Sequence, residues 1–312
     1  MLSNSARGLQ GIIGKHRSEL ALKRFQGSMP TTTDAQKARK RAFVSGASNE
    51  AGAAVHASRR SLLNRLSDDE YRINCAFRLG VNAFPPPLVA VKCPDCHQTL
   101  SESTSHGLCC PSAAAQGKRT EAHTAMDVAT RVLIRELNPD CVVTGSQDAY
   151  PADKGFRASD AHPEAINHRA DAYVFDIGTG TGHLIDYTFV NSMKSTGKNG
   201  AAPGGHADIA EGEKYAQYGK EYVGFNAESS PALVVLAMER HGSFSKGTRE
   251  YWKAVVHAAH ERQKTSEFPV HLSVLTRRVF QTLAVAMWRV NASHILQFHR
   301  RAFDGARRVG RA

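Results

Sequence analysis

The chain has 312 residues, 41% of them hydrophobic, and its 40 Lys and Arg against 29 Asp and Glu give a formal net charge of +11. This length allows one large domain or two ordinary ones with a buried core. No apolar run is long enough to span a bilayer, and residues 1–30 hold no continuous apolar stretch, so we expect a nuclear or cytoplasmic protein that is neither membrane-bound nor secreted. The basic excess favours a polyanionic partner, DNA or RNA, although basic tails on a solvated protein give the same excess.

The N-terminal part is predicted to be largely unstructured. Residues 1–65 are rich in Ser, Ala, Gly, Lys and Arg and show little apolar periodicity, which predicts a flexible basic leader with at most one short helix. A helix should begin at Ser67, because Ser67 can cap the first turn and Glu70 follows three residues later to complete a capping box. This helix and the cysteines that follow it make up residues 66–117.

Four of the six cysteines lie between Cys93 and Cys110 with a histidine among them, a clustering that favours a metal over a disulfide framework. Cys93 and Cys96 form a CxxC turn in which both thiolates can face one ion. With His106 and Cys110 they form a closed tetrahedral set, so we predict a structural Zn²⁺ site, a CCHC zinc knuckle. Three alternatives stay open: Cys109 as ligand instead of Cys110, a redox CxxC, and unrelated buried thiols.

The remainder, residues 118–302, mixes helical and strand patterns and predicts an α/β domain. A Gly-, Ser-, Lys- and Asn-rich stretch at 194–206 is expected to be a flexible insertion, and residues 303–312 a basic tail. Helices are expected over 120–137, 211–221, 245–263 and 272–301, and strands over 140–144, 172–177, 183–190, 222–225 and 233–238.

Two carboxylates stand on the strands that flank the glycines at 178–182: Asp171 opens the first strand, and Asp186 lies within the second. If these glycines turn a hairpin, the two acids can lie close together on adjacent strands. Such a pair forms a site for Mg²⁺ or Mn²⁺, the basis of metal-assisted phosphodiester cleavage. The alternative is a plain hairpin in which Asp171 caps a strand entry and Asp186 faces solvent.

A nuclease site of this restriction-endonuclease-like kind also uses a lysine that orients the attacking water. The usual position is two residues after the second acid, where this chain has Thr188. A lysine can also reach the site from a following helix, and Lys214 is the best candidate. Asp148, before the first of the two strands, is a candidate for a third carboxylate.

The same turn also matches a nucleotide-cofactor loop. Residues 176–182, an acid followed by GxGxG, are typical of an S-adenosylmethionine-dependent methyltransferase. Two features oppose this interpretation. The segment after Gly182 is β-branched and aromatic where the cofactor fold needs a helix, and the acid expected about twenty residues later falls in the glycine-rich linker.

In their order over residues 66–300, these motifs resemble the C-terminal region of non-LTR retrotransposon polyproteins, downstream of the reverse transcriptase. The chain holds no Tyr-x-Asp-Asp motif, so we expect no polymerase activity from it. The matching segments are Leu66–Tyr71 and Phe77–Gly80, then Cys93, Cys96, His106 and Cys110, Lys118-Arg119 with a displaced His123, Arg169–Asp171 with Asp186, Lys214-Tyr215, Pro231–Val235 with Glu239 and Gly242, and Arg289–Ala292.

The resemblance implies a PD-(D/E)XK restriction-endonuclease-like core, a small mixed sheet flanked by helices, preceded by the CCHC knuckle. It implies a metal-dependent endonuclease that nicks target DNA for reverse transcription, with a reverse transcriptase encoded elsewhere as partner. Because position 188 lacks the lysine, a non-catalytic nucleic-acid-binding remnant is the first alternative and the methyltransferase the second. The arginines expected to contact phosphates are Arg119, Arg169, Arg289, Arg300 and Arg301.

Overall fold

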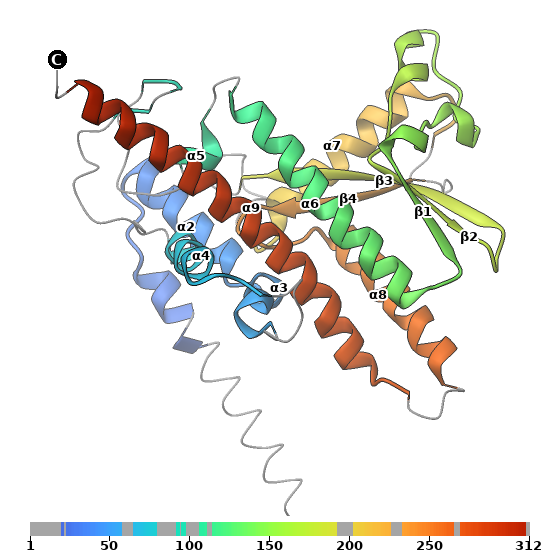
Figure 1. The fold of residues 1–312 in the computed structure, drawn as a ribbon, viewed down its shortest axis with the longest axis horizontal. Coiled ribbons are helices and arrows are strands. Elements are labelled where there is room, and N and C mark those ends of the chain that lie inside the picture. Colours follow the sequence, from blue (N-terminus) through green and yellow to red (C-terminus); the bar gives the residue numbers. More distant parts are fainter. Residues whose placement is uncertain are drawn as a thin grey trace, which may run out of the picture.

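The computed structural model is a mixed α/β fold in which helices cover both faces of one four-stranded sheet (Figure 1). It describes residues 20–309 apart from 22, 58–64, 80–91, 94, 98–105, 111–113, 192–201, 226–232 and 265–268. The predicted fold class is confirmed at this level. In the described part, no helix has both the length and the apolarity that crossing a bilayer requires.

The sheet has the strand order β1-β2-β3-β4. The first two pairs are antiparallel, whereas β3 and β4 are parallel and joined through a helix. The glycines between β2 and β3 do turn a hairpin, in which the Asp176 carboxylate accepts the backbone N–H groups of Gly178 and Thr179. The strands are β1 (Cys141–Gly145), β2 (Ala172–Asp176), β3 (Thr181–Val190) and β4 (Leu233–Glu239).

Alternation along the strands separates two cores, because successive side chains of a strand point to opposite faces. Ile185 and Tyr187 of β3 belong to the larger core, beneath α6 (Ala114–Leu137), α8 (Lys246–Gln263) and α9 (Leu272–Val309). Leu184 belongs to the second core, beneath α7 (Gly205–Glu221). Asp186, two residues after Leu184, therefore lies on the α7 side of the sheet.

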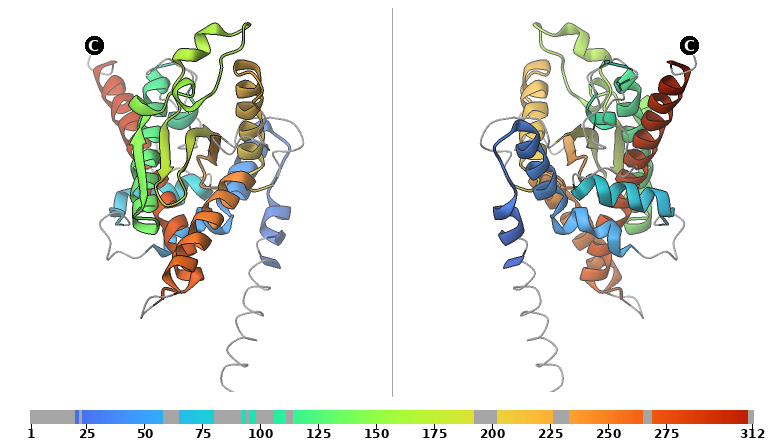
Figure 2. Two further views of the ribbon diagram at one scale, coloured as in Figure 1. Left: turned by 90° about the vertical axis from the view of Figure 1, so that its right-hand side faces the viewer. Right: turned by 90° about the vertical axis from the view of Figure 1, so that its left-hand side faces the viewer.

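The predicted flexible leader is wrong for residues 34–56, which form helices packed on the rest of the fold (Figure 2). The first, α2 (Asp34–Gly46), begins at a capping box formed by Thr33 and Gln36. The next two, α3 (Asn49–Gly52) and the 3-10 helix η1 (Ala53–His56), bury Ala51 and Ala54, the latter in a cluster with Trp288 of α9. Small residues make these contacts, so the segment has no strong apolar pattern to read.

The other predicted element boundaries are confirmed in some places and differ in others. The capping box of α4 (Asp68–Leu79) is confirmed, since Ser67 and Glu70 exchange bonds of 2.7 and 3.2 Å. Tyr222 forms an isolated bridge with Ala158 in place of the strand expected at 222–225. Most of the insertion lies outside the described residues, but His206 is in α7, and α9 continues into the expected basic tail as far as Val309. The remaining short helices are α5 (His106–Cys109), η3 (Ser146–Asp148), η4 (Ala152–Lys154) and η5 (Pro163–Asn167).

A substitution at Gly242 tests whether the N-terminal helices pack on the rest of the fold as described. Its φ is +100°, and an added Cβ would lie 2.9 Å from the Cα of Ala51. We expect Gly242→Ala to lower the free energy of unfolding by about 1–3 kcal/mol, because both the left-handed backbone and the clash are unfavourable. Gly212→Ala is the matched control, since Gly212 lies in α7 in open space and alanine favours the helix. Equal urea midpoints for the two variants would contradict this packing.

Candidate active site and metal centre

The first candidate site is a Cys3His cluster, defined as Cys93, Cys96, His106 and Cys110. Their ligand atoms all lie within 4.8 Å of one another, and the cluster can hold a metal ion such as zinc. Two thiolates on one zinc, each about 2.3 Å from it, lie roughly 3.8 Å apart in a tetrahedron. The Sγ atoms of Cys93 and Cys110 are 3.7 Å apart. Cys110 is therefore a member, whereas the side chain of Cys109 lies outside the described residues.

The Cys3His cluster is attached to the last helix. Asp95, inside the CxxC turn, accepts two bonds of 2.9 and 3.0 Å from the guanidinium of Arg301 on α9. The ring of His106 lies 5.6 Å from that of Phe298 on the same helix. A metal in the cluster would therefore tie the loop at 93–97 to α5, and both to α9.

The second candidate site is the acid pair, Asp171 and Asp186. The last registered pair of the β2–β3 ladder is Ala172 with Ile185, so Asp171, one residue earlier, stands opposite Asp186. The backbone N–H of Asp171 donates to Ile185 O at 2.9 Å, and its carboxylate accepts the N–H of Tyr187 at 2.6 Å. The two carboxyl groups are close enough to share a hydrogen bond. The plain-hairpin alternative, with Asp186 facing solvent, is wrong because Asp186 is 5% exposed.

Helix α7 supplies the partners of Asp186. The Nζ of Lys214 lies 2.9 Å from Oδ2 of Asp186, so the predicted lysine does reach the acid pair. The hydroxyl of Tyr218 donates to the same oxygen at 3.1 Å. Lys214 and Tyr218 are four residues apart and so lie on one face of the helix. That spacing is a signal for Tyr218 in the sequence, although the motif pointed instead to Tyr215, whose hydroxyl accepts the N–H of Val235.

Helix α6 supplies a partner of Asp171 from the other face of the sheet. The Nδ1 of His123 lies 3.1 and 3.2 Å from the two carboxylate oxygens of Asp171. A carboxylate only accepts, so the histidine Nδ1–H donates. His123 was not among the predicted site residues. The sequence offered only its place after Lys118-Arg119, because no spacing connects it to an acid 48 positions later.

The pair is electrostatically asymmetric. Burial raises the pKa of Asp186 to about 6, and the nearby Asp171 adds to this, while Lys214 opposes it. Burial also acts to raise the pKa of Asp171, but the bonds from His123 and Tyr187 outweigh it and the net shift is downward. Two carboxyl groups with separated pKa values in a shared site are typical of functional sites.

The other predicted residues lie on η3, on α6 and α9, and two residues before Asp171. Asp148 is exposed on η3, next to Ala149, whose carbonyl accepts the backbone N–H of Ala170. The guanidinium of Arg169, a residue two positions before Asp171, lies 4.6 Å from the centre of the Tyr150 ring. Arg289 donates to the carbonyl of Arg65. Arg301 binds Asp95 as described above and Arg300 is exposed, while the side chain of Arg119 lies outside the described residues.

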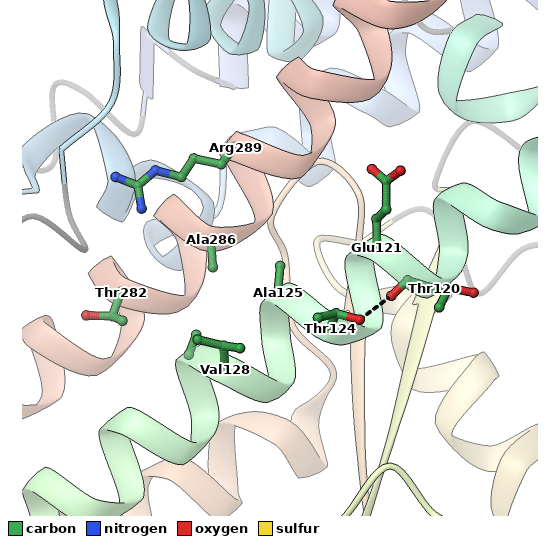
Figure 3. A pocket seen from close by; sticks show the side chains of 9 residues that line it. Thr120, Glu121, Thr124, Ala125, Val128, Thr282, Ala286 and Arg289 are labelled. Atoms are coloured by element: carbon green, nitrogen blue, oxygen red, sulfur yellow. Dashed lines mark hydrogen bonds between the residues drawn. The ribbon is translucent and has the colours of Figure 1, made fainter. Parts of the chain in front are cut away.

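A separate groove of about 470 Å³ lies between α6 and α9 (Figure 3). Its apolar wall includes Ala125 and Val128 of α6 and Ala286 of α9, and Glu121 and Arg289 carry its charges. None of the Cys3His ligands or the paired acids lines it, so it is distinct from both sites.

Comparisons of the chain with protein-family models, curated proteins and solved structures gave no match.

The Cys3His cluster predicts that the purified chain carries zinc. We expect Cys93→Ser to abolish zinc binding, measured by elemental analysis, and to lower the thermal midpoint by several degrees, because a metal that binds only the folded state stabilises it. Cys141→Ser is the matched control: Cys141 lies in β1 outside the cluster, and its substitution should leave the zinc content unchanged. Equal zinc content in the two variants would sink the assignment.

The raised pKa of Asp186 predicts a pH-dependent cost to stability. The folded state holds this proton more tightly than the unfolded chain, so stability falls as the pH rises from about 4 to about 6 and stays reduced above that. Without added divalent ions, Asp186→Asn should therefore raise the free energy of unfolding at pH 7.5 by roughly 1–3 kcal/mol and change it little near pH 4. Asp160→Asn, at an exposed carboxylate, is the control. A variant no more stable than the parent at pH 7.5 would contradict the buried charge.

Proposed function

We propose that the chain is a metal-dependent DNA endonuclease that cleaves one phosphodiester strand. The observation that supports this best is the contact of Asp171, Asp186 and Lys214. Asp171 directly precedes β2, Asp186 lies in the adjacent β3 and Lys214 in the following helix, and the lysine amine lies 2.9 Å from the second acid. Two acids opposite each other on neighbouring backbone segments of a sheet, with a lysine from the following helix, are the parts that a restriction-endonuclease-like site uses.

The architecture is consistent with a PD-(D/E)XK core. One acid stands where a strand begins, the other lies in the next strand, and a helix then leads into a parallel strand. The Cys3His cluster precedes this core, in the place of a zinc knuckle. We therefore propose the chain to be the zinc-knuckle and endonuclease region of a non-LTR retrotransposon polyprotein, with a reverse transcriptase encoded elsewhere as its partner.

The acid pair fits Mg²⁺ or Mn²⁺ on chemical grounds. Both ions prefer oxygen ligands, and Mg²⁺ is typically held by one or two carboxylates together with phosphate oxygens. The pKa of Asp186 is raised by burial and by its like-charged neighbour, and a cation between the carboxylates would relieve that repulsion. When bound, the ion would polarise the scissile phosphate and stabilise developing charge.

The chain's own groups would handle the water and the substrate. The Lys214 ammonium, 32% exposed, would orient the attacking water beside Asp186. Tyr218 would hold the Asp186 carboxylate in place, and His123 would hold that of Asp171. The exposed guanidiniums of Arg169 and Arg300 are available for phosphates, in line with the basic charge.

One observation favours a second function, a nucleic-acid-binding remnant that no longer cuts. Position 188, where a catalytic lysine usually follows the second acid, holds Thr188 on β3. In such a remnant the Lys214–Asp186 ion pair would be structural only. The methyltransferase interpretation has no comparable support, because β3 follows the glycine turn directly where the cofactor fold needs a helix.

A nicking assay on supercoiled plasmid with Mg²⁺ or Mn²⁺ tests the proposal. We expect the intact chain to nick, and Asp171→Asn, Asp186→Asn and Lys214→Met each to lower the rate by about a hundredfold or more, because each removes a group that stabilises transition-state charge. Asp160→Asn and Lys220→Met are matched controls, an exposed acid and an exposed lysine of α7.

Nicking that survives loss of either acid would refute the assigned site. No nicking by the intact chain, with salt-sensitive DNA binding retained, would refute the endonuclease and leave the remnant. In the second case Asp171→Asn should leave the DNA affinity unchanged.

A further inference from the structure

A buried carboxylate outside the acid pair, that of Glu239, binds the start of α7, the helix that carries Lys214. Glu239, the last residue of β4, is fully buried. Its Oε1 accepts the backbone N–H of His206 at 3.0 Å, and the backbone amides of Ala207 and Gly204 also act on this carboxylate. These amides belong to the N-cap residue Gly204 and to the first turn of α7, where no N-cap side chain bonds the helix. Glu239 therefore caps α7 from the neighbouring strand.

The start of α7 is fixed from several directions. Gly204 has φ +84°, and an added Cβ would lie 2.4 Å from the carbonyl oxygen of Phe244, so this close approach requires glycine. Ser45 of α2 donates its hydroxyl to the other oxygen of Glu239. The Ser45 carbonyl in turn accepts the hydroxyl of Ser243 at 2.6 Å. Helix α2, the end of β4 and the first turn of α7 thus meet at one buried carboxylate.

The distance from Glu239 back to the level of Asp186 along β4 is nearly equal to the distance from the start of α7 to Lys214 along the helix. Glu239 lies four residues beyond Val235, the partner of Asp186 in the parallel ladder, which is about 13 Å along the strand. Lys214 lies nine residues beyond the start of α7, about 14 Å along the helix. Because α7 runs back along the strand, fixing its first turn at Glu239 brings Lys214 level with Asp186. The 3.2 Å bond from the Val235 N–H to Tyr215 fixes the same register at its other end.

We propose that Glu239 is a positioning residue that sets the register of α7 on the sheet and thereby holds Lys214 against Asp186. The consequence for catalysis rests on the proposed endonuclease function. The positioning itself does not, because it concerns the contact between Lys214 and Asp186 whether or not the chain cuts DNA.

Acetylation of the intact chain by acetic anhydride, followed at each lysine by mass spectrometry, tests the positioning directly. Lys214 is paired and partly covered, whereas Lys220 on the same helix is exposed and provides an internal reference. We expect Glu239→Ala to raise the labelling rate of Lys214 relative to Lys220 by about tenfold, the factor for one lost charge-assisted contact. Glu239→Gln, whose amide oxygen can still accept the His206 N–H, should keep Lys214 slow. Glu213→Ala, at an exposed glutamate of α7, should change nothing.

Slow Lys214 labelling in a folded Glu239→Ala chain would overturn the proposal. If circular dichroism shows that this variant does not fold, Glu239→Asp replaces it, because it keeps the charge and shortens the reach by one methylene; unchanged labelling there also overturns it.

Nicking kinetics of the same variants separate this inference from the proposed function. We expect Glu239→Ala to lower kcat with KM little changed, and Glu239→Gln to restore kcat. Loss of nicking with slow Lys214 labelling would show that Glu239 acts in another way. An intact chain that never nicks, but releases Lys214 in Glu239→Ala, would refute the endonuclease and leave the positioning role standing.

Discussion

Repulsion between two carboxylates, Asp171 directly before β2 and Asp186 within β3, is the constraint around which the sheet and its helices are arranged. Asp171 and Asp186 are held opposite each other by the ladder of β2 and β3, and Asp186 is nearly inaccessible to water. Like charges in a buried position are unfavourable unless other groups bind them. His123 approaches Asp171 from α6, while Lys214 and Tyr218 approach Asp186 from α7. Helices on both faces of the sheet are therefore needed to support the pair.

The edge strand β4 connects the acid pair to distant parts of the chain through its own hydrogen bonds. β4 has β3 on one side only, and its other edge would leave N–H groups unpaired. Tyr215 of α7 accepts the N–H of Val235, and Thr248 of α8 accepts that of Ala237. Glu239 then closes the strand end by binding α7 and, through Ser45, α2. The N-terminal helices consequently belong to the same structure as the acid pair.

The two candidate metal sites differ in the ions that they can hold. Three thiols and one imidazole suit a soft or borderline ion such as zinc in a closed tetrahedral site. Two carboxylates with a neighbouring ammonium suit a hard cation that shares its coordination with phosphate oxygens. The Cys3His cluster is bound to α9 through Asp95 and Arg301, so its role in the described structure is to attach the segment around the cluster to the last helix.

Short-range patterns in the sequence predict several of the helices, strands and site residues of this protein. The Cys3His ligands, the α4 capping box, the hairpin and the four sheet strands could be predicted because each depends on residues near one another in sequence. Only the tertiary structure showed that His123 reaches Asp171, 48 positions away, and that Tyr218 rather than Tyr215 binds Asp186. It also replaced the predicted flexible leader over residues 34–56 with helices, because Ser45 and small buried alanines find their partners on β4 and α9. Those contacts follow from which elements pack together, and no periodicity in the sequence encodes that choice.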